Sequence, residues 1–127
     1  GPADGIPVIL IHGWPDSVNS FDRLRPLLST RLRVFTVGLR GFGGSDKPPD
    51  GYSIPQFAAD VRSFCEAKAI RRAVVVGHSM GSIVAHALAS RWPRLVSDLV
   101  LVDACRTARD SAVLAEVANE INAPRFS

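Results

Sequence analysis

The chain has 127 residues, 46% of them hydrophobic, and a net charge of +3. This balance fits one globular domain with its own core and excludes an intrinsically disordered segment. The basic residues form no aromatic-interleaved patch, so we expect no nucleic-acid partner. No run reaches the roughly 18 apolar residues of a membrane span, and no signal segment opens the chain. Cys65 and Cys105 lack metal-ligand spacing. Two cysteines so far apart predict a reduced, cytoplasmic protein, and a disulfide between them is the less favoured alternative.

Apolar runs of strand length alternate with helical patterns along the chain. Strands are predicted at residues 6–11, 33–37, 73–76 and 99–102. Helices are predicted around residues 21–28, after Ser53, over residues 82–91 and over residues 109–121. This alternation predicts an α/β fold, in which a parallel sheet carries helices on both faces and the crossovers are right-handed.

Two of the predicted helices carry specific signals. The first is indicated by an apolar stripe at helical spacing, formed by Phe21, Leu24, Leu27 and Leu28. The second begins at Ser53, and Gln56 follows three residues later, which is the pattern of a capping box.

The most informative stretch is Gly77-His78-Ser79-Met80-Gly81, which lies between a β-branched strand and a helical pattern. This spacing is typical of a nucleophile elbow, a sharp turn that exposes a serine hydroxyl above the strand ends. The turn brings backbone segments so close together that only glycine fits two residues before and two residues after the serine. The alternative is a Gly/Ser turn that only links strand to helix, and the matching flanks disfavour it.

Four positions follow the carboxyl ends of predicted strands: His12, Gly38, Ser79 and Asp103. In parallel α/β sheets, ligands bind beyond the carboxyl ends of the strands. We therefore expect these residues to border one shared site.

Three motifs in this order resemble the α/β-hydrolase family, in the branch of the epoxide hydrolases, haloalkane dehalogenases and carboxylesterases. They are His12-Gly13-Trp14-Pro15, the Leu-Arg-Gly-Phe-Gly-Gly-Ser-Asp-Lys-Pro stretch over residues 39–48, and the Gly77 to Gly81 motif. Ser79 stands where the epoxide hydrolases and dehalogenases have an aspartate nucleophile. The resemblance therefore implies a serine-dependent member.

The resemblance also implies which part of the family's domain is present. It implies a strand order of 2-1-3-4 and makes residues 1–127 a partial domain that corresponds to the family's third to sixth strands. The C-terminal half of that domain, with most of the cap and the catalytic histidine, lies outside these residues. We therefore expect a complementary C-terminal fragment or an oligomer partner.

The expected site residues follow from the elbow and from the resemblance. Ser79 is the expected nucleophile, and the backbone N–H groups of Trp14 and Met80 are the expected oxyanion donors. The resemblance makes Asp103 a lesser choice for the triad acid, against a loop-capping aspartate. The residues expected to border the substrate are His12, Gly13, Trp14 and His78.

None of the three histidines is an obvious base for Ser79. His86 lies seven residues along the same helix, about 10 Å from the serine, and is predicted to pack on or near a core face. His78 adjoins the nucleophile and is predicted to pack within the elbow. His12 is the nearest alternative base, although the resemblance gives it a structural role beneath the oxyanion loop.

These observations predict a hydrolase that acts on a small-molecule carboxylic ester or related acyl bond, without a cofactor or a metal. The catalytic histidine is expected from outside this chain, so the isolated chain is expected to be inactive. Two alternatives remain open. One is a non-catalytic fragment or binding module that retains the pocket, and the other is a carbon–carbon bond hydrolase or perhydrolase of the same fold.

Overall fold

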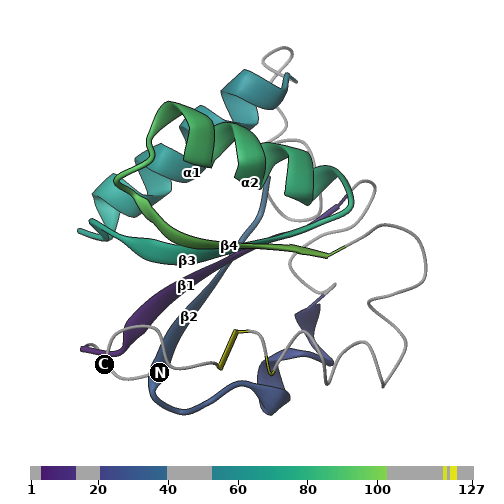
Figure 1. Cartoon of the computed structure of the whole chain (residues 1–127), viewed down its shortest axis with the longest axis vertical. Coiled ribbons are helices and arrows are strands. Elements are labelled where there is room, and N and C mark those ends of the chain that lie inside the picture. The colour runs from purple at the N-terminus through teal and green to yellow at the C-terminus, as the bar shows by residue number, and fades with distance from the viewer. Residues whose placement is uncertain (1–3, 14–20, 40–52, 103–118, 120, 123–127) are drawn as a thin grey trace.

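The computed structural model describes residues 4–13, 21–39, 53–102, 119 and 121–122. The elements in chain order are β1 (Ile6–Ile11), the 3-10 helix η2 (Arg25–Leu27), β2 (Leu32–Val37), α1 (Ile54–Ala67), β3 (Ala73–His78), α2 (Met80–Arg91) and β4 (Val96–Val102). The strands pair in parallel in the order β2-β1-β3-β4 (Figure 1). The predicted α/β fold class and strand order are therefore confirmed.

The two central strands are apolar on both faces. Along β1, Ile9 and Ile11 pack into the core beneath the α-helices, whereas Val8 and Leu10 pack into a second core on the other face. All four side chains are fully buried. Double-sided burial explains why this run contains no alternating polar positions.

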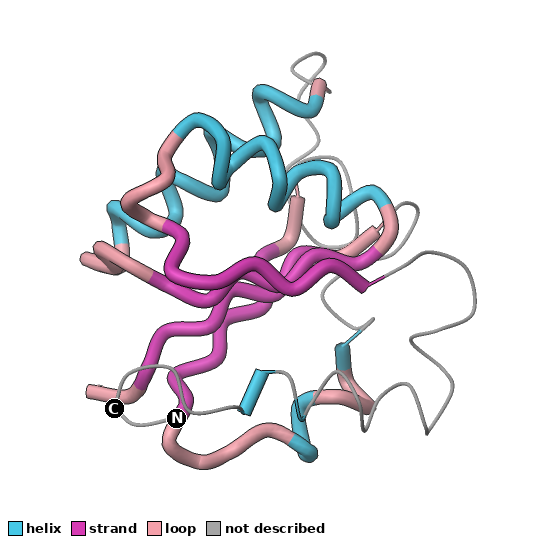
Figure 2. The backbone as a smooth tube through the Cα atoms, in the orientation of Figure 1, coloured by secondary structure: helices cyan, strands magenta, loops and turns pink. Residues whose placement is uncertain are grey.

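Helix α1 and helix α2 cover the same face of the sheet, and Figure 2 shows them together above the layer of strands. The other face packs against Phe21, Leu24 and Ile121, which belong to the segment around η2 and to a helical stretch near the C-terminus. Asn122 joins these two segments, because its Oδ1 accepts from the Ser29 N–H at 2.8 Å and its Nδ2 donates to the Leu27 carbonyl at 3.2 Å. Helical segments therefore contact both faces of the sheet, as predicted. None of the helices in the described part of the chain is long and apolar enough to cross a membrane.

The prediction of a regular helix over residues 21–28 is wrong. The structure has only the three-residue η2 there, and Leu27 from the predicted apolar stripe is 47% exposed. The backbone bonds are of the i to i+3 type, from the Leu24 N–H to the Phe21 carbonyl and from the Leu27 N–H to the Leu24 carbonyl. Pro26 lacks the N–H that an α-helix would need at that position, which limits the segment to short 3-10 turns.

Ser53 is the N-cap of α1, as predicted, and its Oγ accepts from the Gln56 N–H at 3.2 Å. The second bond of a capping box, in which the Gln56 side chain accepts from the Ser53 N–H, is not among the bonds of the described residues. The Gln56 side chain instead donates from Nε2 to Asp60 Oδ1 at 3.0 Å, one helical turn further on. Only the serine half of the predicted capping box is confirmed.

Four elements are longer than predicted. β2 begins at Leu32 and β4 at Val96, β3 continues to His78, and α2 begins at Met80, directly after the serine. Of the added residues of β4, Val96 lies opposite Ala73 and Asp98 lies opposite Val74. The register shifts by one residue between these two pairs, so Ser97 forms a bulge. Most of the helix predicted over residues 109–121 lies outside the described residues.

Candidate active site

Ser79 lies between the end of β3 and the start of α2. Figure 1 shows that β3 passes into α2 at the carboxyl edge of the sheet. The Ser79 backbone has φ 57° and ψ −119°, a conformation that is strained for a residue with a side chain. The Ser79 N–H donates to the carbonyl of Val102, the last residue of β4, at 3.1 Å. The Ser79 side chain does not cap α2. The turn therefore has the backbone geometry of a nucleophile elbow.

The two glycines of the elbow lie where no side chain fits. A Cβ atom at Gly77 would be 2.3 Å from the carbonyl oxygen of Gly81. A Cβ atom at Gly81 would be 2.3 Å from the carbonyl oxygen of Ile11 and 2.6 Å from that of His12. Real Cβ atoms essentially never approach backbone this closely, so both positions require glycine. The physical reason that predicted the G-x-S-x-G spacing is therefore present in the structure.

Gly13 brings the end of β1 against the serine. A Cβ atom at this glycine would lie 2.7 Å from the Cβ and 3.3 Å from the Oγ of Ser79, and 2.8 Å from the carbonyl oxygen of His78. Gly13 is therefore in contact with the elbow itself, and its expected place beside the substrate stays a prediction. The signal in the sequence was its place two residues after the first strand.

His12 is fully buried, and both of its ring nitrogens have hydrogen-bond partners. The Leu39 N–H donates to Nε2 at 3.0 Å, so the proton of the neutral ring lies on Nδ1. Nδ1 is 2.9 Å from the Gly13 carbonyl oxygen and donates to it. This arrangement links the segments that follow β1 and β2, and it fits an anchoring role better than that of a base for Ser79.

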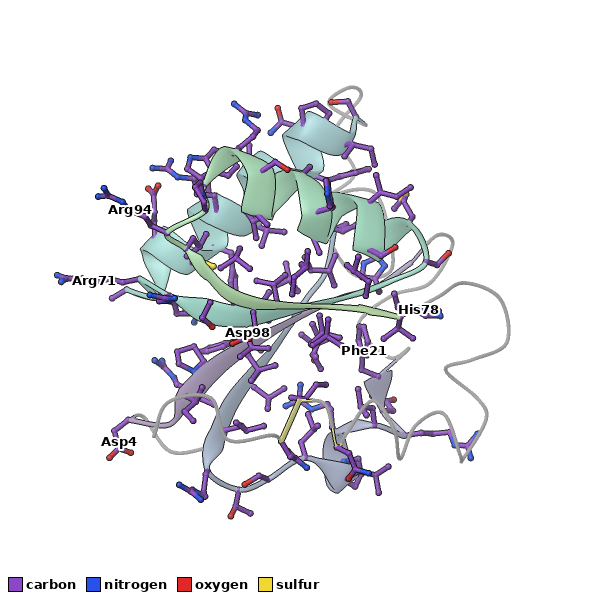
Figure 3. All side chains as sticks on the ribbon, in the orientation of Figure 1. Asp4, Phe21, Arg71, His78, Arg94 and Asp98 are labelled. Atoms are coloured by element: carbon purple, nitrogen blue, oxygen red, sulfur yellow. The ribbon has the colours of Figure 1, made fainter. Side chains whose placement is uncertain are left out.

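The other two histidines differ in burial. His78 is 5% exposed and ends β3 beside the serine, as expected for a residue packed within the elbow. Figure 3 shows its side chain at the carboxyl end of the sheet. His86 is exposed on α2, so the prediction that it packs on a core face is wrong. The helix turns this position toward solvent, whereas Val84, Ala85 and Leu88 face the core.

Two predicted site residues, Trp14 and Asp103, lie outside the described residues. Each is covalently joined to a residue that meets the elbow, because Trp14 follows Gly13 and Asp103 follows Val102. Met80 is described, and it is the first residue of α2. The N–H groups in the first turn of a helix have no partner within that helix.

The described residues contain no cluster of three or more histidine, cysteine or acidic side chains that could hold a metal ion. Cys65 carries a free thiol in α1, in the core on the helical side of the sheet. Burial raises the pKa of this thiol from 9.0 to about 11, so it stays protonated at neutral pH.

Comparison with known proteins agrees with this fold. The family model described as alpha/beta hydrolase fold matches residues 6–127. The chain belongs to the alpha/beta hydrolase family. Among its relatives is a serine hydrolase-like protein of Danio rerio, 40% identical over 105 residues, which cover 81% of this chain and 32% of the relative.

Two further relatives of this alpha/beta hydrolase have names that point to different reactions. A non-heme chloroperoxidase of Streptomyces lividans is 42% identical over 106 residues, which cover 82% of this chain and 38% of the relative. The solved structure of epoxide hydrolase CorEH without ligand is 34% identical and superposes with a TM-score of 0.76 over 84% of this chain and 39% of that chain. The 127-residue chain thus spans between 32% and 39% of the length of these relatives.

Proposed function

We propose that this alpha/beta hydrolase cleaves a carboxylic ester or a related acyl bond, with Ser79 as the nucleophile. The observation that carries the proposal is the strained backbone of Ser79, at φ 57° and ψ −119°. Such strain persists only where the surroundings enforce it, and it is concentrated at functional sites. Here the close backbone contacts of Gly13, Gly77 and Gly81 supply those surroundings.

The proposed oxyanion donors are the backbone N–H groups of Met80 and Trp14. Met80 supports this role by its place at the start of α2, where the N–H groups and the helix dipole favour negative charge. For Trp14, the support comes from the bond between His12 Nδ1 and the Gly13 carbonyl oxygen. A trans peptide directs its N–H opposite to its C=O, so a fixed Gly13 carbonyl also fixes the direction of the Trp14 N–H. His12 is therefore proposed as a positioning residue.

In the proposed reaction, Ser79 Oγ attacks the substrate carbonyl carbon while a histidine takes the hydroxyl proton. The same histidine returns the proton to the leaving alcohol, and water then hydrolyses the acyl-enzyme. Both ring nitrogens of His12 are hydrogen-bonded and His86 lies about 10 Å along α2. We therefore propose that the base comes from outside these residues, with Asp103 as a candidate for the acid that orients it.

The similarity to a chloroperoxidase favours a second candidate, perhydrolysis at the same serine. Hydrogen peroxide would then replace water as the acceptor of the acyl group, and the product would be a peracid. Formation of peracetic acid from acetic acid and hydrogen peroxide, measured beside ester hydrolysis, distinguishes the two reactions.

We also propose that these residues form part of a hydrolase domain, which a further segment or subunit completes. In the described sheet, β2 and β4 are the outer strands, and outer strands carry backbone groups that can pair with another strand. On β4, Leu101 is 51% exposed. We also propose a reducing, cytoplasmic compartment, supported by the free thiol of Cys65.

The test is covalent labelling of the full-length protein with a fluorophosphonate, followed by peptide mapping and assay with p-nitrophenyl acetate. The label should lie on Ser79, and Ser79→Ala should abolish labelling and lower turnover by about a million-fold. Ser90→Ala removes an exposed hydroxyl from the same helix and should change neither result. A label on another residue, with Ser79 unmodified, would contradict the nucleophile assignment. Ester binding without label or turnover would favour the non-catalytic module.

A further inference from the structure

A cavity of about 720 Å³ lies between the C-terminal ends of α1 and α2, near the amino ends of β3 and β4. The six residues of β3 separate it from Ser79, a distance of about 20 Å. Figure 3 shows this separation, because Arg71 and Arg94 from the cavity lie at the opposite end of the molecule from His78. The cavity therefore does not belong to the candidate active site.

The rim of this cavity is strongly basic. Its charged lining residues are Arg62, Arg71, Arg91, Arg94 and Glu66. Glu66 Oε1 is 2.6 Å from Arg62 Nη1, which leaves the other three guanidinium groups without that carboxylate as a partner. This concentration of positive charge is large for a chain whose net charge is only +3. A guanidinium group matches the geometry of a carboxylate or phosphate group and can bind it through two hydrogen bonds.

Trp92 orders two of these arginines. The guanidinium carbon of Arg62 lies 5.0 Å from the centre of the Trp92 ring, and that of Arg91 lies 4.7 Å from it. Cation–π contact at these distances restricts long side chains that would otherwise be mobile. Two cationic groups are thereby held close to one aromatic ring before any ligand arrives, and such preorganisation lowers the entropic cost of binding.

The floor of the cavity is apolar. It includes Ile70, Leu95 and the nearly inaccessible Cys65, which is 1% exposed. Burial raises the pKa of the Cys65 thiol to about 11, so the floor disfavours negative charge in spite of the arginines above it. A ligand that suits both parts has an uncharged, apolar body on the floor and its negative charge at the rim.

We propose that this cavity binds a small amphipathic organic anion, with its carboxylate or phosphate head at Arg91 and Arg94 and its apolar body against Ile70 and Trp92. The volume lies within the range of about 300 to 1,000 Å³ that is usual for small-molecule sites. The site is distinct from Ser79 and does not depend on the proposed hydrolytic function.

The test measures binding of two matched probes to the full-length protein by isothermal titration calorimetry. 2-Naphthoate carries the anionic head, and 2-naphthamide has the same apolar body without the charge. 2-Naphthoate should bind at least about tenfold more tightly than the amide, because hydrogen bonds to a charged group are worth about 1.5–3 kcal/mol. A parallel titration with 2-naphthyl phosphate shows whether the site prefers a phosphate or a carboxylate head.

Arg91→Gln and Arg94→Gln should each weaken 2-naphthoate binding by about tenfold or more. Arg33→Gln is the matched control, because Arg33 also lies over an aromatic ring, 4.8 Å from the centre of Phe35, and is not among the cavity residues. Having two rim variants keeps the test valid if one of them folds poorly. NMR shifts should map 2-naphthoate to the Trp92 indole.

Several results would overturn the proposal. Equal affinity for 2-naphthoate and 2-naphthamide would show that no anionic head is recognised. Equal binding by the Arg91, Arg94 and Arg33 variants would place the ligand elsewhere, and the elbow would then be the nearest alternative. A lower melting temperature of Arg91→Gln, with unchanged binding, would limit Arg91 to stabilising the C-terminus of α2.

Discussion

At its carboxyl end β3 enters a turn where backbone packs directly against backbone, whereas at its amino end it begins beside a cavity lined by long side chains. At the first end there is no space for a Cβ atom at Gly13, Gly77 or Gly81. At the second end, the cavity of about 720 Å³ is bordered by four arginines and one glutamate. The two ends therefore depend on different interactions. Close backbone contacts form the carboxyl end, whereas charged and apolar side chains form the amino end.

This difference determines what substitution does at each end. A change at the elbow must move backbone, so it affects folding and the proposed chemistry together. Replacing an arginine at the cavity rim alters charge while the backbone stays in place, so its main expected effect is on binding. Each of the following predictions tests one end of this comparison.

The largest effect is expected for Gly81→Ala. The new methyl group would lie 2.3 Å from the Ile11 carbonyl oxygen, so the start of α2 would have to move away from β1. We expect unfolding in urea to show a loss of about 3 kcal/mol or more, at or above the upper end of the usual cost of overpacking. Fluorophosphonate labelling of Ser79 should be lost as well. Wild-type stability with full labelling would contradict the requirement for glycine at this position.

His12 should affect rate more than stability. His12→Asn can still donate to the Gly13 carbonyl from the Nδ1 position, whereas His12→Gln can only replace Nε2 as the acceptor for Leu39. If the Gly13–Trp14 peptide supplies an oxyanion donor, kcat of the full-length enzyme should fall about 100-fold or more in His12→Gln and much less in His12→Asn. Urea unfolding of both variants provides the control. Equal kcat values for the two variants would contradict the positioning role.

Stability at the cavity end should depend on pH through Cys65. The unfolded thiol loses its proton above a pKa of about 9, whereas the buried thiol keeps its proton up to about 11. Between these values the unfolded state binds fewer protons, so the free energy of unfolding should fall by about 1.4 kcal/mol per pH unit. Cys65→Ala should remove this part of the slope in urea titrations. A slope that is identical in both proteins would show that the thiol is not responsible.

The smallest effect, and a favourable one, is expected at Ala69, which also lines the cavity. This residue has φ 56° in the turn after α1, where the Ile70 N–H donates to the Cys65 carbonyl at 2.8 Å and the Ala69 N–H donates to the Glu66 carbonyl at 3.1 Å. This is a Schellman motif, and its left-handed position favours glycine.

Ala69→Gly should therefore stabilise the protein by about 0.5–1 kcal/mol, because it relieves the strain of the left-handed conformation. Ala67→Gly, at the last residue of α1, is the matched control and should cost about 0.5–1 kcal/mol. Thermal unfolding of the two variants measures both values. A loss of stability in both would show that the positive φ at Ala69 carries little strain.

The local sequence was sufficient to predict the strands and the elbow. The run over residues 6–11 is apolar at every position, apart from Pro7, because both of its faces are buried. The spacing of Gly77, Ser79 and Gly81 is a local motif, and it predicts the turn without the rest of the chain. The close contact of Gly81 with the Ile11 carbonyl oxygen, in contrast, joins two distant segments. The motifs around these residues were also sufficient to predict the family, which the family comparison confirmed.

Local sequence was insufficient where two structures share one pattern. Phe21, Leu24 and Leu27 are spaced by three residues, which fits both an α-helix and a 3-10 turn, and Pro26 favours the second. Ala69 gave no signal, because a left-handed turn residue is usually recognised by glycine or asparagine. At Ala69 the chain accepts the local cost of a positive φ, and the packing of α1 against the sheet compensates for it.

The remaining features depend on residues that only tertiary structure brings together. Ser79 meets the carbonyl of Val102, and His12 meets the N–H of Leu39, through backbone groups that any residue type could supply. Arg62 lies on α1 and Arg91 lies on α2, and both guanidinium groups contact the Trp92 ring. The spacing of residues in the sequence predicts contacts within one element or turn. Which distant groups lie side by side depends on how the separate elements pack in the tertiary structure.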